Sequence, residues 1–443
     1  MIIKTASIEG SDEKTLHFFQ RSLIGKLYKK FFKKIPFIRS FVLWGWKRFF
    51  PFGFRIYAKL RSEKFIQIPL VKFSEFFGDR KVLYPKQTIL TPAPNVFPKY
   101  LRHAVVQPHT EYDFPEIFKG LVENCIVVGA SNSLSVKEHL IFHDLIDFTH
   151  DYTSEELHGR FIVDIEKSLV TRLTLPSVEL EIDDGVVFTD AVSRNYAHFL
   201  TELLPRMFVF FRDQPQNSGI TMIIDAGLHQ NLMDAIELVV GTAESMIGLE
   251  VGEAALVKSL QVVSPCGYVP FEKRPGKEML LGHSSGVFSP IALMSMRDFI
   301  QKKIAGLALK RTPSRIYIRR NSEYRNVSNA AEIETLLLAN GFSIIEPEKL
   351  TFLEQVEYFS NADLVVGATG AALANLIFCA PSTRIVILIA KFKHTSYYYW
   401  QNMASACGNH VTYVLGEVDS GTGKNIHSNF KVSSKYILEA MSA

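Results

Sequence analysis

Residues 314–390, SRIYIRRNSEYRNVSNAAEIETLLLANGFSIIEPEKLTFLEQVEYFSNADLVVGATGAALANLIFCAPSTRIVILIA, decide the fold class of this chain. Short β-branched runs alternate here with segments that have helical spacing. The pattern predicts strands at 315–320, 343–345 and 363–366, separated by helices at 330–339 and 352–359. Such alternation is typical of a parallel sheet covered by helices, so we expect an α/β protein.

The last of these strands runs into a turn of small residues, Gly367-Ala-Thr-Gly370-Ala371, ahead of another helix. Small residues at a strand-to-helix turn leave backbone N–H groups and the positive helix end free to hold an anion. The turn lacks the full GxGxxG spacing of a dinucleotide fingerprint, and small residues also serve close packing. We therefore expect a nucleotide or diphosphate site only in combination with other groups at the same sheet edge.

An arginine ends the first strand of this stretch, where ligands of open α/β sheets bind. The guanidinium of Arg320 could hold a diphosphate bidentately, and Arg319 and Arg325 compete for that role. Asn375 follows the glycine turn and either faces the same ligand or packs in the core. Together these elements predict a nucleotide or diphosphate site made of Arg320, Gly367, Thr369, Gly370, Ala371 and Asn375.

With 443 residues and 47% hydrophobic content, the chain can bury two ordinary cores. Strand and helix patterns between 111 and 285 favour a first α/β domain in the range 65–289, with a second domain at 290–443. Six prolines make residues 65–110 read as an irregular lead-in. Two Rossmann-like domains facing a cleft are the simplest architecture.

The first 64 residues form a separate basic and aromatic segment. Between residues 21 and 64 nearly every charged side chain is lysine or arginine, with Glu63 the single acid. Apolar residues recur four apart among them, which predicts a basic amphipathic helix. No apolar run is long enough to span a bilayer. We expect this segment to bind an anionic membrane surface; a hairpin packed on the protein is the alternative.

The densest polar constellation in an apolar setting is Asn195-Tyr-Ala-His-Phe-Leu-Thr-Glu-Leu-Leu-Pro-Arg206. His198 and Glu202 lie four residues apart and share a helix face, which is a plausible acid/base pair; an ordinary surface pair is the alternative. Asn195 can cap the helix, whereas Pro205 disturbs it and makes the direction of Arg206 uncertain. Asn195 and Arg206 are therefore expected to bind acceptor or to support the site.

Several other classes of function are disfavoured. The net charge of +4 does not indicate a nucleic-acid partner, and no GxSxG, P-loop or HExxH motif is present. Metal binding is poorly supported, because Asp164-Ile-Glu166 lies in a predicted strand without other ligands. The acidic and histidine residues between 143 and 158 resemble solvated loop residues. The four widely spaced cysteines favour free thiols in a reducing compartment.

Over residues 111–430 the chain resembles glycosyltransferase family 61, which includes bacterial capsular-polysaccharide-biosynthesis proteins. The resemblance is strongest in Asn195-Tyr-Ala-His-Phe with Glu202 and Leu204-Pro-Arg206. It continues in these pieces: Pro115-Glu-Ile-Phe118, Val127-Val-Gly-Ala130, Ile316-Tyr-Ile-Arg-Arg320, Tyr324-Arg-Asn-Val327, Gly341-Phe342, Phe352-Leu-Glu-Gln355, Ala362-Asp-Leu-Val-Val-Gly367 and Gly370-Ala-Ala-Leu-Ala-Asn375.

Membership would imply a GT-B architecture and an inverting, nucleotide-sugar-dependent transferase without an obligatory metal or other cofactor. It implies an acceptor-side domain at 65–289 and a nucleotide-sugar domain at 290–443. Glu202 or His198 would be the base, and Arg320 with the turn around Gly370 would hold the donor diphosphate. The acceptor would be a capsular or other cell-surface glycan, free or lipid-linked, at the cytoplasmic membrane face.

Two positions depart from the family pattern, because Thr369 stands where histidine is common and Leu388 where an acidic residue is frequent. These departures keep a second hypothesis open, a non-catalytic glycan- or nucleotide-binding component of an envelope polysaccharide assembly complex. A nicotinamide-dependent oxidoreductase is a third hypothesis, disfavoured by the incomplete glycine pattern.

Overall fold

The computed structural model describes residues 67–104, 110–157, 160–173, 176–213, 219–241, 245–270, 272–274, 286–305, 312–322, 324–392, 398–419 and 428–443. The expected membrane-surface segment, residues 1–64, lies outside them. Within the described residues no helix is both long enough and apolar enough to cross a membrane.

The larger sheet has eleven strands within the described part of the chain. Its order is β10 (Phe161–Asp164), β11 (Leu169–Arg172), β1 (Gln67–Lys72), β8 (His139–Phe142), β7 (Leu134–Val136), β6 (Ile117–Val128), β15 (Ala254–Val263), β12 (Val178–Phe188), β13 (Thr221–Asp225) and β14 (Ser245–Leu249), with β2 (Lys81–Tyr84) paired to β6. The last four strands of this order are parallel to one another. The predicted α/β class is therefore confirmed for this half.

Four strands of the smaller sheet lie within residues 314–390. Its order is β20 (Ser343–Ile345), β19 (Arg315–Ile318), β21 (Leu364–Ala368), β22 (Arg384–Ala390), β23 (His410–Val418) and β24 (Phe430–Lys431), with β4 (Asn95–Phe97) paired to β23. All pairs except β23–β24 are parallel. The predicted strands and the helices between them, α10 (Ala330–Ala339) and α11 (Phe352–Ser360), are present.

Residues 65–110 are more regular than expected. They contain β1, α4 (Phe73–Phe76), β2, β3 (Gln87–Leu90), β4 and the 3-10 helix Lys99–Ala104. Pro69 lies inside β1 at the point where the strand changes partners, from β11 on residues 67–69 to β8 on residues 70–72. A proline lacks the N–H that a continuous ladder needs, so this change of partner accommodates it. The prediction of an irregular lead-in was wrong.

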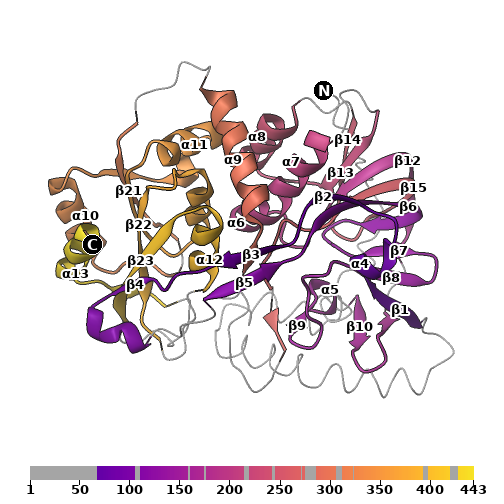
Figure 1. The fold of residues 1–443 in the computed structure, drawn as a ribbon, viewed down its shortest axis with the longest axis horizontal. Coiled ribbons are helices and arrows are strands. Elements are labelled where there is room, and N and C mark those ends of the chain that lie inside the picture. Colours follow the sequence, from indigo (N-terminus) through magenta and orange to yellow (C-terminus); the bar gives the residue numbers. More distant parts are fainter. Residues whose placement is uncertain are drawn as a thin grey trace, which may run out of the picture.

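Helices that lie between the two sheets connect the two halves of the molecule (Figure 1). These are α7 (Leu204–Asp213), α8 (Gln230–Val240), α9 (Pro290–Ile304) and α12 (Tyr398–Ala406). A single hydrophobic cluster extends from Met207 on α7 through Met296 on α9 to Leu376 and Ile387 of the C-terminal half. The two halves therefore share buried apolar surface, which is the main stabilising contribution at such a junction.

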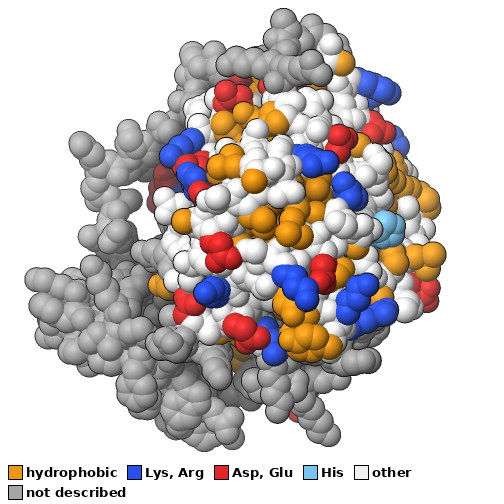
Figure 2. All heavy atoms as spheres, turned by 90° about the vertical axis from the view of Figure 1, so that its left-hand side faces the viewer, with side chains coloured by type: hydrophobic (Ala, Val, Ile, Leu, Met, Phe, Trp, Pro, Cys, Tyr) orange, Lys and Arg blue, Asp and Glu red, His pale blue; other side chains and the backbone are white. Residues whose placement is uncertain are grey.

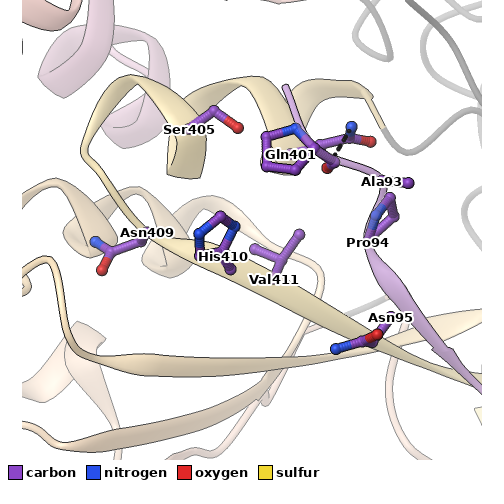
Figure 3. A pocket seen from close by; sticks show the side chains of 9 residues that line it. Ala93, Pro94, Asn95, Gln401, Ser405, Asn409, His410 and Val411 are labelled. Atoms are coloured by element: carbon purple, nitrogen blue, oxygen red, sulfur yellow. Dashed lines mark hydrogen bonds between the residues drawn. The ribbon is translucent and has the colours of Figure 1, made fainter. Parts of the chain in front are cut away.

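The segment before β4 is fixed to the C-terminal half by a buried amide. Gln401 on α12 is 3% exposed, and its Nε2 donates to the carbonyl oxygens of Thr91 (3.1 Å) and Pro92 (3.0 Å). A cavity of about 90 Å³ lies here, lined by Pro94, Ser405 and His410 among others (Figure 3). Its lining residues Asn95 and His410 begin β4 and β23, so it lies at the end of the sheet opposite to the carboxyl ends of these strands.

The outer face of the C-terminal half carries lysine, arginine, aspartate and glutamate side chains interspersed with hydrophobic ones (Figure 2). The described atoms of this face show no large area of one charge sign. Elsewhere in this half the ion pairs include those of Arg319 with Glu334 (2.6 Å) and Glu346 (2.8 Å). This mixture is typical of a solvated surface.

A buried arginine fixes α9, a helix of the junction, to the C-terminal half and gives a test of this attachment. Arg297 is 6% exposed, and its Nη1 donates to the carbonyl oxygens of Cys379 (3.1 Å) and Cys407 (3.0 Å). Arg297→Met would leave both carbonyls without this donor. We expect it to lower the free energy of unfolding by about 2 kcal/mol or more, measured by chemical denaturation.

Arg315→Met is the matched control, because exposed Arg315 also donates to a backbone carbonyl, that of Asn340 (3.0 Å). It should change stability by less than about 0.5 kcal/mol. Equal effects of the two substitutions would contradict a structural role for Arg297 at the junction.

Candidate active site

The N-terminal half of the candidate site lies where the strand order of the larger sheet reverses. From β12 the chain proceeds to β13 and β14 on one side, then returns as β15 on the other side of β12. The carboxyl ends of β12 and β15 lie at one edge, because Val186 pairs with Gln261 in parallel register. Ligands of α/β sheets bind at such a switch point.

A distorted helix begins just beyond β12. Asn195 caps it by accepting from the backbone N–H of Ala197 (3.0 Å), as predicted. One turn of α-helix, α6 (Tyr196–His198), passes into the π-helical turn Phe199–Leu203 and then into α7. Pro205 has no N–H to offer the carbonyl of Thr201 four residues earlier, and a π-turn is a common way to absorb such a break. The helix therefore continues through Pro205.

Gly267 makes room for this widened turn. A Cβ atom at Gly267 would lie 2.3 Å from the Thr201 carbonyl oxygen, so no other residue fits without a backbone shift. The backbone after β15 can thus approach the π-turn closely. This approach brings the N–H of Val269 to the buried end of Glu202.

His198 and Glu202 form the expected pair. Nδ1 of His198 lies 2.6 Å from Oε1 of Glu202, and the N–H of Val269 donates to Oε2 over 3.2 Å. Burial opposes protonation of His198, but the charge and hydrogen bond of Glu202 outweigh it, so the His198 pKa is raised above its ordinary value. Glu202 is 7% exposed, which excludes the alternative of an ordinary surface pair.

Asp190 is a second buried carboxylate at this strand edge, and the sequence analysis did not identify it. Its oxygens accept from the backbone N–H of Val192 (3.0 Å) and from Nδ2 of Asn132 (3.2 Å). Burial and the charge of Glu202 raise the pKa of Asp190 to about 7. One feature of the sequence could have identified Asp190: it lies two residues beyond a strand whose carboxyl end is at the switch point.

Arg206 points into the same region from α7. It is 8% exposed, its guanidinium lies 5.9 Å from the ring centroid of Phe188, and its Nε has no hydrogen-bond partner. Burial lowers the pKa of Arg206, whereas the negative charges of Asp190 and Glu202 raise it. The cation therefore balances the two buried carboxylates, and an acceptor contact by Arg206 stays a prediction.

The C-terminal half has a second switch point. The chain order of its strands is 2-1-3-4-5 across the sheet, with the reversal between β19 and β21. Arg320 follows β19 and Gly370 follows β21, so both lie at this point. A Cβ at Gly370 would be 2.0 Å from Nη1 of Arg320. The guanidinium thus lies directly over the glycine turn.

The structure separates the three candidate arginines. Arg319 is engaged by Glu334 and Glu346, whereas Arg320 and Arg325 form no ion pair with any described residue. Nε of Arg320 donates to the carbonyl of Tyr324 (2.8 Å), and Nε of Arg325 is buried without a partner. Burial and the nearby positive charge of Arg325 lower the Arg320 pKa to about 10. Glu348 acts in the opposite direction but is not ion-paired with either arginine, and two adjacent unpaired cations favour an anionic ligand.

The other residues predicted to bind the donor occupy different places around the turn. Gly367 lies within β21 beside Ile318, whose Cβ would be 3.1 Å from an added Cβ. Thr369 is 6% exposed and donates its N–H to the carbonyl of Leu388 (3.1 Å). Ala371 begins the 3-10 helix η7 (Ala371–Phe378). Donor contacts by these residues stay predictions.

Asn375 joins the two halves of the candidate site. It is fully buried, and its Oδ1 accepts from the hydroxyl of Tyr196 over 2.7 Å. Its Nδ2 donates to Oε1 of Gln355 (2.8 Å) and to the carbonyl of Ala372 (3.1 Å). The helix that carries His198 is thus hydrogen-bonded directly to the helix that follows the glycine turn.

Four of the other acidic residues have separate local partners, whereas His143 is buried and its Nδ1 has no hydrogen-bond partner among the described residues. Asp144 accepts from the N–H of Ser74, Asp147 pairs with His150, and Asp151 pairs with Lys273. Asp164 accepts from the N–H of Lys167 in the turn after β10. No group of three or more His, Cys, Asp or Glu suited to a metal ion occurs within the described ranges.

Comparison with known proteins bears on one part of the chain. No curated protein matches the sequence. The family model Glycosyltransferase 61 matches residues 196–386, which contain His198, Glu202, Arg320 and Gly370. The match confirms the resemblance seen in the sequence and supports glycosyltransferase family 61 over the part of the chain that carries both halves of the candidate site.

Proposed function

We propose that the protein is an inverting glycosyltransferase of GT-B architecture that takes a sugar from a nucleotide-sugar donor. The family match supports glycosyltransferase activity. The observation that carries the finer proposal is the hydrogen bond between Tyr196 and Asn375. It links a buried acid/base pair at one switch point to a cationic turn at the other, as transfer between two bound substrates requires.

The chemistry assigned to each half follows from its charge. The His198–Glu202 pair would take the proton of an acceptor hydroxyl, whose oxygen then attacks the anomeric carbon of the donor sugar. The bond from that carbon to the diphosphate breaks, and the leaving diphosphate keeps the electron pair. Arg320, Arg325 and the start of η7 would bind the negative charge that develops on it.

Nε2 of His198 is the atom we propose as proton acceptor. Both oxygens of Glu202 are already hydrogen-bonded, to His198 and to Val269, and Nε2 bonds to no other described residue. Glu202 would then hold the imidazole in place and stabilise the imidazolium that forms. The two residues thus take different parts in one step.

The acceptor side of the proposal concerns the membrane. We propose that the acceptor is a growing capsular or other cell-surface glycan at the cytoplasmic face, and that residues 21–64 hold the enzyme there. The support is the excess of basic and aromatic residues in that segment. Sedimentation with phosphatidylserine-containing vesicles should require residues 21–64, and unchanged sedimentation without them would contradict this part.

A non-catalytic component of a polysaccharide assembly complex is the competing proposal. It rests on Thr369 and Leu388, and Leu388 is fully buried within β22. Such a component would bind nucleotide or glycan and leave every donor unchanged. Incubation of the whole protein with UDP-, GDP- and CMP-sugars, followed by measurement of released nucleotide, separates the two proposals.

Glu202→Gln tests the acid/base pair. A base must be deprotonated to act, so the rate of nucleotide release should rise with pH through the raised His198 pKa. Glu202→Gln removes the carboxylate charge that raises this pKa. The rise of the rate with pH should therefore occur at lower pH in this variant. The plateau rate should fall by roughly a hundredfold. An unchanged pH profile in this variant would contradict the pairing.

Arg320→Gln tests the diphosphate cradle. Loss of charge-assisted hydrogen bonds to phosphate should weaken nucleotide binding at least about tenfold and abolish the rise in melting temperature that UDP or GDP produces. Gly370→Ala should act similarly, because the added Cβ displaces the guanidinium without removing its charge.

Arg319→Gln is the matched control for this experiment. Arg319 is the neighbouring arginine and is held by Glu334 and Glu346, so its loss should leave the nucleotide-dependent rise in place. If Arg320→Gln and Arg319→Gln respond to nucleotide alike, the cradle is assigned to the wrong residue.

A further inference from the structure

Asn375 connects two structural elements, α6 and η7, through its side-chain hydrogen bonds. It lies fully buried in η7, five residues beyond Gly370, and both N–H groups of its amide are used within the protein. One of them donates to the carbonyl of Ala372, in the first turn of η7. The amide is therefore fixed relative to the turn over which Arg320 lies.

The remaining bond of this amide leaves the C-terminal half. Oδ1 of Asn375 accepts from the Tyr196 hydroxyl over 2.7 Å. Burial raises the Tyr196 pKa, so the hydroxyl remains a donor at physiological pH. Tyr196 is the first residue of α6, and His198 is the last residue of the same turn.

The start of α6 is also held by its own cap and by Arg194, whose guanidinium donates to the carbonyl of Ala226. Asn195 caps it through its own side chain, and the π-turn follows immediately after His198. A π-turn is wider than an α-turn and often marks a functional adjustment of a helix. An anchored tyrosine at the first position therefore sets the direction in which the imidazole projects towards Glu202.

We propose that Asn375 and Tyr196 are positioning residues that hold His198 and Glu202 in register with the glycine turn. This assignment replaces direct donor binding by Asn375. The positioning role rests on the proposed function, because its purpose is to align the base His198 with a donor held by Arg320. The hydrogen bonds that carry it do not depend on the identity of the sugar.

The test is a titration of His198 by NMR in the whole protein, with ¹³C-labelled histidine and with His198→Gln to assign the signal. In Tyr196→Phe the contact of His198 with Glu202 should loosen, so the His198 pKa should fall from its raised value towards about 6.5. Asn375→Ala should act in the same direction. If it fails to fold, Tyr196→Phe, which removes a single oxygen, decides alone.

Tyr112→Phe is the matched control. The Tyr112 hydroxyl donates over 2.8 Å to the carbonyl of Phe288, so the variant removes an equivalent buried hydrogen bond elsewhere. It should leave the His198 titration unchanged. If Tyr196→Phe also leaves it unchanged, or if both variants shift it alike, the positioning role is overturned.

A second arm separates this inference from the proposed function. Inorganic pyrophosphate serves as the probe, and its binding should shift the His198 signal in the wild-type protein but much less in Tyr196→Phe. Binding that leaves the wild-type His198 signal unmoved would overturn the coupling between turn and helix. If pyrophosphate does not bind at all, the Arg320 cradle is wrong, and the titration still decides the positioning claim.

Discussion

A carboxylate removed from water must be hydrogen-bonded and charge-balanced, and Glu202 imposes this requirement on the centre of the molecule. One oxygen meets His198, and the other meets the backbone N–H of Val269. The second contact requires the chain after β15 to pass close to the π-turn, which it can do only because Gly267 has no Cβ. The buried charge of Glu202 thus connects three features: the π-turn, the path of the backbone after β15 and the protonation of His198.

The two halves of the candidate site use the same property of parallel sheets. Where neighbouring strands send their connections in opposite directions, the carboxyl edge is left open for polar groups. At the first such point the groups are Asp190, Glu202 and Arg206, with a near balance of charge. At the second they are Arg320 and Arg325, with no described acid paired to them. In the proposed mechanism, this difference in charge assigns proton transfer to the first point and anion binding to the second.

Local patterns predicted the fold well where each element depends on its own residues. The expected bounds of α10 and β20 agree with the structure, because capping and periodicity act within a few residues. The expectation failed for residues 65–110, where β4 pairs with β23 more than 300 positions away. No local pattern reveals such a partner, and the prolines were taken as breaks when Pro69 marks a change of strand partner.

The site could be predicted only where it depends on local spacing. The His198–Glu202 spacing was sufficient because four residues make one helical turn. The choice between Arg319 and Arg320 was not available, since it depends on Glu334 and Glu346, which two other elements supply. Asp190 was missed because its importance comes from burial beside Glu202. The hydrogen bond from Tyr196 to Asn375 spans 179 positions and also required the structure.

The central claim is that an acid/base pair and an anion cradle face one common substrate space across the two switch points. A structure determined with the nucleotide that most raises the melting temperature, UDP, GDP or CMP, tests it most directly. The account predicts phosphate oxygens between the guanidinium of Arg320 and the backbone of Gly370, with the terminal phosphate towards His198. Nucleotide bound elsewhere, for example in the cavity beside Gln401, would contradict it.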